Sequence, residues 1–353
     1  MSLIVSHVLT AWQKEALLIL QNEQNRCPNT PLFKLCNISG IDLYVKDETL
    51  QPTGTHKHRL ARSLLSCALR RGKINENTRL FEASSGSTAR SEAYFAKKLG
   101  LEYTTVVNRE TPKEKLDLIN AEGGNIVLCD PGQDKQVARN LAEQTNGYFV
   151  DQFKFAALST NYLHDNIASE LHQQLRTLGL GLPEFIVCGS GTGGVSATLG
   201  RYFKHHQLKS KIIVVDPDNS AFYPAYLCKD YSLTTGKCSR IGGIGRPQVE
   251  ESFLMDQIDG MIQVPDGASL AAIHFLKKHF NYWMGGSTGT NLFGCFELID
   301  KMHRENCKGS IVTFFFDSGL LYQNTYYNHE WIEKEGLKDE MERYLKLMQK
   351  RKG

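Results

Sequence analysis

Short apolar runs alternate along most of the chain with longer stretches in which apolar residues recur every three or four positions. The first pattern is typical of buried strands and the second of amphipathic helices. The alternation predicts strands at 42–46, 79–83, 104–108, 125–129, 184–188, 211–215 and 310–316. It predicts helices at 58–71, 88–99, 112–122, 161–178, 195–205 and 330–350. Repeated strand–helix alternation favours an α/β fold with open, mostly parallel sheets that helices flank on both faces.

The alternation is interrupted near Gly147–Gln152, where a domain crossing is expected. A length of 353 residues is enough for two domains. We therefore expect a smaller domain at residues 48–150. The larger domain would combine residues 1–47 with 151–353 and end in the C-terminal helix.

Composition narrows the class of protein. Hydrophobic residues make up 41% and charged residues 22%, which is ordinary for a globular protein. A net charge of +3 does not suggest a nucleic-acid partner. Nine cysteines without a CxxC pair suggest reduced thiols. The first 20 residues lack a basic start and carry polar residues within the apolar stretch, so neither a signal peptide nor a membrane span is expected. A soluble, cytoplasmic protein is expected, and no metal site, since the pair His205-His206 has no nearby ligand.

A first cluster, Glu82-Ala83-Ser84-Ser85-Gly86-Ser87-Thr88, lies between a predicted strand and a predicted helix. Ligands of open α/β sheets bind beyond the carboxyl ends of the strands. Backbone N–H groups and hydroxyls at a helix start favour a carboxylate or a phosphate. An ordinary helix N-cap explains this cluster equally well when it is taken alone.

A second cluster, Gly189-Ser190-Gly191-Thr192-Gly193-Gly194, also joins a strand to a helix. It lacks the lysine of a nucleoside-triphosphate loop. It satisfies G-x-G-x-x-G, and Asp216 ends the next strand where a dinucleotide-binding protein places its ribose ligand. The segment therefore predicts a phosphate-binding loop. A nicotinamide-dependent oxidoreductase remains a rival interpretation of it.

The chemistry depends most on Lys57. Pro52 and Gly54 predict a turn, after which Lys57 begins a helix. A helix N-terminus disfavours an ammonium ion and so favours the neutral amine that attacks an aldehyde. Most lysines in such positions are simply solvated. A further Gly-rich turn, Gly285–Thr290, opens a later helix and taken alone is only a cap.

The segment KDETLQPTGTHKHR around Lys57 resembles the cofactor-lysine segment of the cysteine synthase-like (fold type II) enzymes, which use pyridoxal 5′-phosphate (PLP). The resemblance extends from about Thr30 to Tyr322 and implies a two-domain fold type II PLP enzyme. The family's other motifs follow in its order. The substrate-carboxylate loop is matched by Ser84-Ser85-Gly86-Ser87-Thr88, and a glutamine near the substrate carboxylate by Gln152. The phosphate loop is matched by Gly191-Thr192-Gly193-Gly194, a mobile loop by Gly243-Ile244-Gly245, the pyridine-nitrogen serine by Ser287 and a cofactor-side turn by Asp317-Ser318-Gly319.

This resemblance implies that Lys57 carries PLP and is the catalytic base. It also implies that Ser87, Gly191–Gly194 and Ser287 contact the cofactor. The residues expected to bind the amino-acid substrate are Ser84, Ser85, Gly86, Thr88 and Gln152. The smaller domain would be mobile and bind the substrate carboxylate, the larger would bind the cofactor phosphate, and the protein would be a homodimer.

Within the family the chain is most similar to the L-cysteine desulfhydrases, which eliminate sulfide from L-cysteine to leave pyruvate and ammonia. Ser87 is the main distinguishing residue, because cysteine synthases usually carry Asn there. A cysteine synthase, acting on O-acetylserine and sulfide, is the alternative. A protein that keeps the fold but has lost catalysis is a further one.

Overall fold

The computed structural model describes residues 8–352. Residues 1–7, where the segment considered as a signal peptide begins, and Gly353 lie outside the described residues. The chain forms two compact units. Unit 1 contains the described residues up to Pro28 together with Gln51–Thr160. Unit 2 contains Asn29–Leu50 and the described residues from Asn161 onward.

These boundaries differ from the expected smaller domain at residues 48–150. Both points at which the chain passes between the units are shifted, and the N-terminal segment belongs to the smaller unit. The first helix belongs to the smaller unit because Ala16 and Leu20 pack into the apolar core beneath that unit's helices. The second crossing comes after residue 160 and not after 150, because Ala156 packs with Leu60 and Leu64 of unit 1. Apolar packing, which the alternation of elements does not reveal, thus decides where each unit ends.

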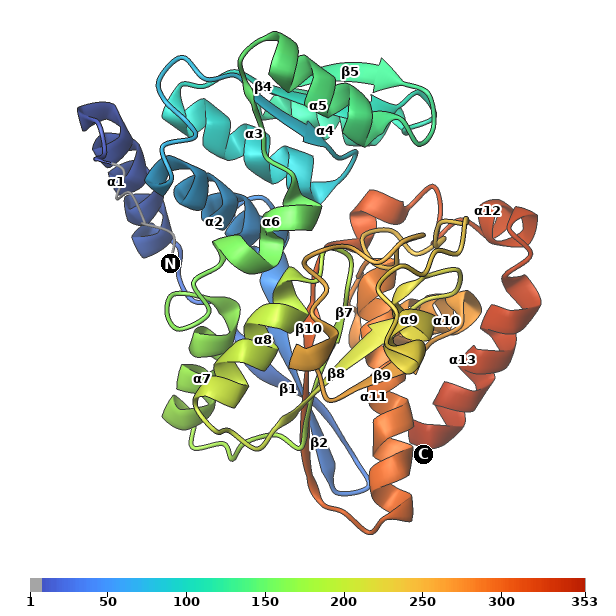
Figure 1. Cartoon of the computed structure of the whole chain (residues 1–353). Helices are drawn as coiled ribbons and strands as arrows, with labels where there is room; N and C mark the ends of the chain where they lie inside the picture. Colours follow the sequence, from blue (N-terminus) through green and yellow to red (C-terminus); the bar gives the residue numbers. More distant parts are fainter. Residues whose placement is uncertain (1–7, 353) are drawn as a thin grey trace. The chain divides into compact units, whose positions relative to one another are not determined.

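Unit 1 is built on a four-stranded parallel sheet with the order β5-β4-β3-β6. The strands are β3 (Leu80–Ala83), β4 (Tyr103–Asn108), β5 (Asn125–Cys129) and β6 (Tyr148–Phe149). The helices are α1 (Ala11–Arg26), α2 (Lys57–Arg70), α3 (Ser87–Leu99), α4 (Lys113–Ala121), α5 (Asp134–Gln144) and α6 (Gln152–Ser159) (Figure 1).

The strands of unit 1 alternate their side chains between two apolar cores. Leu80 and Tyr103 point into the core that α1, α2 and α3 share. Ala83 and Val106 point to the other face, where Ala138 of α5 covers them. Both faces of the sheet are therefore buried. The loops at the strand ends remain as the places where a ligand could be bound.

Unit 2 is built on a six-stranded sheet with the order β1-β2-β10-β7-β8-β9. Only the edge strand β1 runs antiparallel to its neighbour. The strands are β1 (Leu32–Ile38), β2 (Ile41–Asp47), β7 (Phe185–Gly189), β8 (Lys211–Asp216), β9 (Gly260–Gln263) and β10 (Gly309–Phe315). The helices are α7 (Ile167–Thr177), α8 (Gly194–His205), α9 (Phe222–Cys228), α10 (Asp266–Phe280), α11 (Gly286–Arg304), α12 (His329–Lys334) and α13 (Lys338–Lys352). Short 3₁₀ turns lie at Glu48–Leu50, Met255–Gln257 and Gly319–Tyr322.

Two apolar layers cover this larger sheet. Val187 of β7 points into the layer formed with α10, α11 and α13. Ile186 and Cys188 of the same strand point into the layer formed with α7, α8 and α9. Such burial on both faces explains why these strands appear in the sequence as continuous apolar runs. The expected α/β fold class with two mostly parallel sheets is confirmed.

Two predicted helices are wrong in their bounds. The helix expected at 161–178 begins at Ile167, because the Asn166 side chain accepts hydrogen bonds from the backbone N–H groups of Ala168 and Ser169 and caps the helix there. The helix expected at 330–350 is two helices, α12 and α13. Gly336 lies between them with a left-handed φ of +68°, which ends the first helix.

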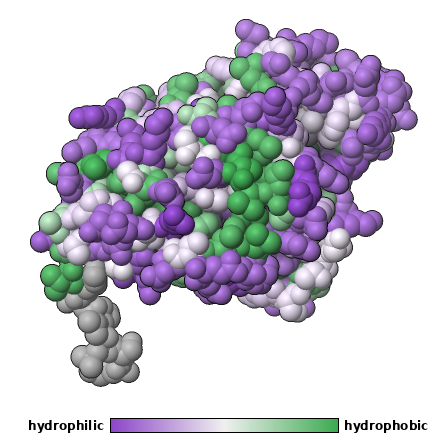
Figure 2. Space-filling model, turned by 90° about the horizontal axis from the view of Figure 1, so that it is seen from above, coloured by the Kyte–Doolittle hydropathy of each residue, from purple (hydrophilic) through white to green (hydrophobic). Residues whose placement is uncertain are grey.

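Hydrophilic residues cover most of the face drawn in Figure 2, with a smaller hydrophobic area among them. Apolar surface of this kind is normal for a globular protein. Among the described residues, no helix combines the length and hydropathy needed to cross a membrane.

Candidate functional site

Lys57 is the first residue of α2, as the sequence predicts. The chain turns just before it: the N–H of Gly54 donates to the carbonyl of Gln51 at 2.7 Å, and Gly54 has a left-handed φ of +73°. The backbone N–H of Lys57 donates to Oγ1 of Thr55 at 3.4 Å. Lys57 is buried, with 9% of its surface exposed, and the first turn of α2 contains no acidic residue. The lysine is therefore held at the positive end of a helix macrodipole.

The predicted substrate loop lies between β3 and α3, with Gly86 as the N-cap of α3. Thr105 on the neighbouring strand fixes its start: Oγ1 of Thr105 accepts from the N–H of Ser84 at 3.3 Å and donates to the Ser84 carbonyl at 2.6 Å. No side chain caps α3, and its first turn carries no acidic residue. Uncapped N–H groups at a helix start suit a carboxylate.

Thr88 and Gln152, which lie 64 positions apart in the chain, meet in unit 1. Oγ1 of Thr88 donates to Oε1 of Gln152 at 2.8 Å, and both residues are buried. Gln152 starts α6, and its backbone N–H donates to Oε2 of Glu82 at 3.0 Å. Two of the residues expected to bind substrate are thus in direct contact, and a buried carboxyl group supports them from the sheet.

A buried pair of carboxyl groups, Glu82 on β3 and Glu92 on α3, lies beneath this loop. Neither residue is exposed. Glu82 accepts from the N–H of Ala83 at 2.7 Å, and Glu92 accepts from the hydroxyl of Tyr103 at 3.0 Å. Burial raises the pKa of both groups, and the charge of Glu82 raises the pKa of Glu92 further. The two carboxyl groups therefore titrate as a pair that favours a protonated state.

A chain of hydroxyl groups connects the lysine segment to the substrate loop. Oγ1 of Thr53, just before Gly54, lies 2.8 Å from Oγ of Ser91 on α3. Oγ of Ser91 in turn donates to the carbonyl of Ser87 at 2.8 Å. Thr53 and Ser91 are buried. The turn before Lys57 and the first turn of α3 are therefore fixed relative to each other by side chains.

The predicted phosphate loop in unit 2 is shaped by close approach of backbone atoms. Gly193 is the N-cap of α8, with φ +88°, and no side chain caps the helix. A Cβ atom on Gly193 would lie 2.3 Å from the Ser252 carbonyl oxygen, and one on Gly191 would lie 2.2 Å from the Gly243 carbonyl oxygen. Only glycine fits at both places. This bare backbone at a helix start is the arrangement that binds a phosphate without a cation.

One hydroxyl group of this loop could donate to a bound anion. Oγ of Ser190 is buried and has no hydrogen-bond partner within the described part of the chain. The N–H of Gly194 donates to Oγ1 of Thr192 at 3.3 Å, and the N–H of Gly245 donates to the carbonyl of Ser190 at 2.9 Å. The predicted loop at Gly243–Gly245 therefore lies against the phosphate loop.

Two further predicted segments come together at the start of α11. Ser287 is the second residue of this helix and is buried. The N–H of Gly285 donates to the carbonyl of Asp317 at 3.1 Å, and a Cβ on Gly285 would lie 2.0 Å from Oδ1 of Asp317. The hydroxyl of Tyr322 donates to Oδ2 of Asp317 at 2.8 Å. The serine expected near a pyridine nitrogen is thus positioned by the turn at Asp317.

Asp216 decides against the dinucleotide interpretation. It is fully buried, and its Oδ2 accepts from the N–H of Tyr223 at 2.8 Å. Burial raises the pKa of Asp216 to about 7, although hydrogen bonds from Ser220 and Tyr223 act in the opposite direction. A ribose ligand needs an exposed carboxylate. This side chain instead supports the loop that leads into α9.

The sequence analysis assigned no role to Glu82, which it placed at the start of the first cluster, and did not identify Glu92. A signal for both was present: Glu82 interrupts an apolar strand, and Glu92 lies on the same helical face as Ala89 and Ala96. A charged residue inside each buried pattern marks a polar group that the fold must satisfy.

Comparisons with known proteins agree with these features. The family model described as "Pyridoxal-phosphate dependent enzyme" matches residues 24–317. The chain is 43% identical to "L-cysteine desulfhydrase Cds1" of Mycobacterium tuberculosis over 93% of this chain and 91% of that protein. It is 24% identical to "Cysteine synthase" of Dictyostelium discoideum over 86% of this chain and 83% of that protein.

A solved structure described as a "hydrogen sulfide-producing enzyme", in a mutant form with an alpha-aminoacrylate intermediate, matches 87% of this chain and 91% of its own. The TM-score is 0.74 and the sequence identity 25%. The match indicates that the two proteins share their fold over nearly the whole chain.

Proposed function

Because the chain belongs to the family of pyridoxal-phosphate dependent enzymes, we propose that it catalyses β-elimination of L-cysteine to sulfide, pyruvate and ammonia. The observation that carries this proposal is the 43% identity to an L-cysteine desulfhydrase over 93% of the chain. The resemblance to a hydrogen sulfide-producing enzyme supports the same product.

The residues present fit the cofactor. Lys57 offers an amine at a helix start, and Gly191 and Gly193 form a bare backbone loop before α8, in which a Cβ atom would collide with the carbonyl oxygens of Gly243 and Ser252. Lys57 would hold the aldehyde end of PLP, and Gly191–Gly194 with Thr192 would hold its phosphate. Ser287 would contact the pyridine nitrogen and Ser87 would contact the ring. PLP, when bound, supplies the electron-withdrawing ring that stabilises negative charge at the substrate Cα.

The chain's own groups would do the remaining work. The loop of Ser84, Ser85, Gly86 and Thr88, together with Gln152, would bind the substrate carboxylate and fix the amino acid. Nζ of Lys57 would then take the proton from Cα. A base placed in this way typically contributes about 10²–10⁴-fold to the rate.

Cysteine synthase activity is the second candidate, since the chain also resembles a cysteine synthase. Incubation with L-cysteine alone should release sulfide and pyruvate in equal amounts. The kcat/KM for cysteine breakdown is then compared with that for O-acetylserine plus sulfide on one preparation. A preference for synthesis above about tenfold, near 1.4 kcal/mol, would overturn the assignment.

Lys57→Ala should abolish turnover, because it removes both the cofactor attachment and the Cα base. The variant should also lose the long-wavelength absorbance of lysine-bound PLP. Lys73→Ala, at an exposed lysine of the same unit, is the matched control and should keep both properties. Retention of most elimination activity in Lys57→Ala would exclude both roles of Lys57.

The homodimer follows from the resemblance alone, and the cytoplasmic location is expected from the cysteines and the composition. The enzyme would act as a homodimer in the cytoplasm. Sedimentation equilibrium of the cofactor-loaded protein tests the first point, and a monomer mass would contradict it.

A further inference from the structure

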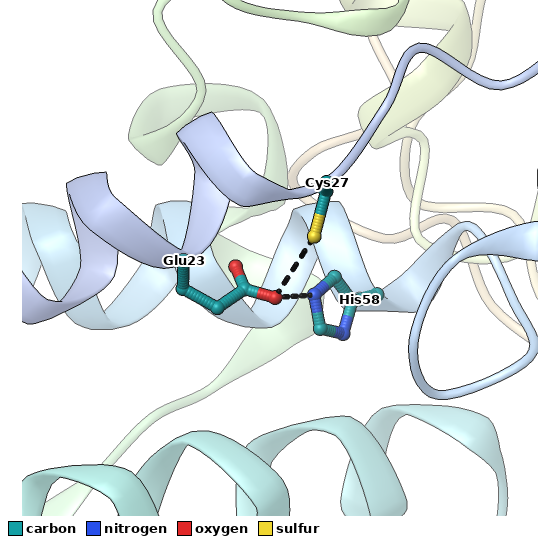
Figure 3. A group of neighbouring side chains, drawn as sticks. All are labelled: Glu23, Cys27 and His58. Carbon is teal, nitrogen blue, oxygen red and sulfur yellow. Dashed lines mark hydrogen bonds and ion pairs between the residues drawn. The ribbon is translucent and has the colours of Figure 1, made fainter.

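Three side chains that commonly bind metal ions lie together in unit 1, outside the residues assigned above: Glu23, Cys27 and His58 (Figure 3). Glu23 and Cys27 are one helical turn apart at the end of α1, and His58 is in the first turn of α2. Sγ of Cys27 donates to Oε1 of Glu23 at 3.2 Å, and Nε2 of His58 lies 2.7 Å from the same oxygen. The three ligand atoms all lie within 4.8 Å of one another.

The cluster is reachable from the surface. Glu23 and Cys27 line a surface pocket of about 510 Å³ together with Asn22, Pro52 and Tyr94. Cys27 is half-buried, whereas Glu23 and His58 are buried. An ion could therefore enter from the pocket, and a water molecule could occupy a fourth position around it.

Neighbouring groups orient two of the three side chains. Nδ1 of His58, the ring nitrogen not facing Glu23, lies 3.3 Å from Oγ1 of Thr53. Nη1 of Arg62 is 3.3 Å from Oε2 of Glu23, the carboxylate oxygen turned away from the cluster. Histidines that bind metals nearly always make such a second hydrogen bond, which fixes the ring. The supporting contacts are thus present without an ion.

We propose that Glu23, Cys27 and His58 bind a divalent transition-metal ion through Oε1, Sγ and Nε2, with zinc the best match. Sulfur and imidazole ligands favour zinc over magnesium or calcium, and three protein ligands leave one position open. On binding, the thiol proton leaves to solvent and the Nε2 proton that His58 donates to Glu23 leaves Nε2, so that the neutral ring carries its proton on Nδ1, beside Oγ1 of Thr53. A thiolate and a carboxylate then balance the two positive charges of the ion. Zinc bonds of about 2.0–2.3 Å separate neighbouring ligand atoms by about 3.3–3.8 Å. Binding therefore needs Oε1 and Nε2, which are 2.7 Å apart, to separate by about 0.6 Å or more, whereas ligand atoms up to 4.8 Å apart must approach by about 1 Å.

A purely structural network of Glu23, His58 and Arg62 is the competing explanation, because a buried carboxylate needs partners of this kind. This explanation gives Cys27 no role beyond its hydrogen bond to Glu23. It also predicts no metal affinity beyond what the exposed cysteines supply. Substitution of Cys27 distinguishes the two explanations with little change in volume.

The experiment uses the full-length, PLP-loaded protein after chelator treatment under reducing conditions. Zinc chloride is titrated in competition with a chromophoric chelator, and bound zinc is quantified after desalting. Cys27→Ser and Glu23→Gln are the test variants. Cys228→Ser removes an exposed thiol of unit 2 and is the matched control. Thermal unfolding is followed with and without zinc, because a ligand of the native state raises Tm.

The proposal predicts one tightly bound zinc in the wild type and in Cys228→Ser, and at least a tenfold weaker affinity in Cys27→Ser and Glu23→Gln. Zinc should raise Tm in the first two proteins only. Less than one equivalent in the wild type, or equal affinity in Cys27→Ser, would overturn it. Cobalt substitution adds a check: a thiolate-to-cobalt absorption should appear in the difference spectrum of the wild type and be missing from that of Cys27→Ser.

Discussion

The proposed substrate loop of unit 1 and the proposed phosphate loop of unit 2 both join a parallel strand to a helix, yet they are held in different ways. The first is fixed by side chains: Thr105 bonds its backbone, Gln152 bonds Thr88, and Glu82 bonds the N–H of Gln152. The second is fixed by contact between backbones, since Gly191 and Gly193 lie directly against carbonyl oxygens of other segments.

This difference predicts different sensitivities. Hydrogen bonds to buried carboxyl groups depend on protonation and on the exact side-chain atoms. Close backbone contact depends only on the absence of a Cβ atom and is indifferent to pH. The substrate loop should therefore respond to pH and to isosteric substitutions, and the phosphate loop should respond to any added side chain.

The largest effect is expected from Gly193→Ala. A Cβ there would lie 2.3 Å from the Ser252 carbonyl oxygen, so the loop must move. PLP should bind at least about 100-fold more weakly, near 2.7 kcal/mol, measured by equilibrium dialysis. Gly193→Asp should be worse, because it adds a negative charge beside the phosphate.

Gly40→Ala is the matched control for this change. Gly40 has the same φ of +88°, and a Cβ there would meet nothing within 4 Å. Gly40→Ala should lower the free energy of unfolding only by the left-handed backbone strain of about 1 kcal/mol, and it should leave the affinity for PLP unchanged. Normal PLP content in Gly193→Ala would show that the phosphate loop is wrongly assigned.

The next effect concerns pH and the pair Glu82–Glu92. Burial raises the pKa of each group above its ordinary value of 4.5, so the folded state binds protons that the unfolded state has lost. The contribution to stability is complete below about pH 4.5 and is lost as pH rises through the folded-state pKa values. Each unit of raised pKa corresponds to about 1.4 kcal/mol.

Glu92→Gln should remove much of that dependence, because an amide cannot ionise but can still accept from the hydroxyl of Tyr103. Urea unfolding between about pH 5 and pH 8 should show a flatter decline than in the wild type. Some decline should remain, since burial also raises the pKa of Asp216 in unit 2 to about 7. Glu143→Gln, at an exposed position of unit 1, should keep the wild-type slope. Equal slopes in all three proteins would contradict a raised pKa of Glu92 in the folded state.

A smaller effect is expected from Thr88→Val, which keeps the shape of the side chain and removes its hydroxyl. The bond to Gln152 is lost, and a buried amide oxygen loses a donor, at a cost of about 1–2 kcal/mol. KM for L-cysteine should rise about tenfold while PLP affinity stays unchanged. Thr88→Ser keeps the hydroxyl and should stay close to the wild type in steady-state kinetics. A changed PLP affinity in Thr88→Val would mean that the substrate loop and the phosphate loop do not act independently in binding substrate and cofactor.

Much of the fold could be predicted from the sequence, and the reason is physical. Strands such as β7 and β8 are marked by apolar runs, because both faces of their sheet are buried. The glycines of the phosphate loop were identifiable because φ > 0 and close backbone contact exclude other residues. Contacts that join distant segments could not be predicted in this way. The meeting of Thr88 with Gln152, of Glu82 with Glu92, and of Cys27 with His58 depends on how helices pack, which no local pattern encodes.

The smallest effect, and the most specific for the substrate loop, is expected from Ser87→Asn. Ser87 is half-buried in the first turn of α3, and its carbonyl is held by Ser91. The longer amide could therefore extend from a fixed backbone without moving the loop. An added amide contact should hold the cofactor and the reacting substrate more firmly and give a second nucleophile time to add. The ratio of kcat/KM for synthesis from O-acetylserine to that for cysteine breakdown should rise a few-fold, on the order of 1 kcal/mol, while cofactor affinity does not fall. Ser85→Asn, two positions earlier in the same loop, is the control and should lower both activities without shifting their ratio. An unchanged ratio in Ser87→Asn would show that this position does not select between elimination and synthesis, and that the preference is set elsewhere in the chain.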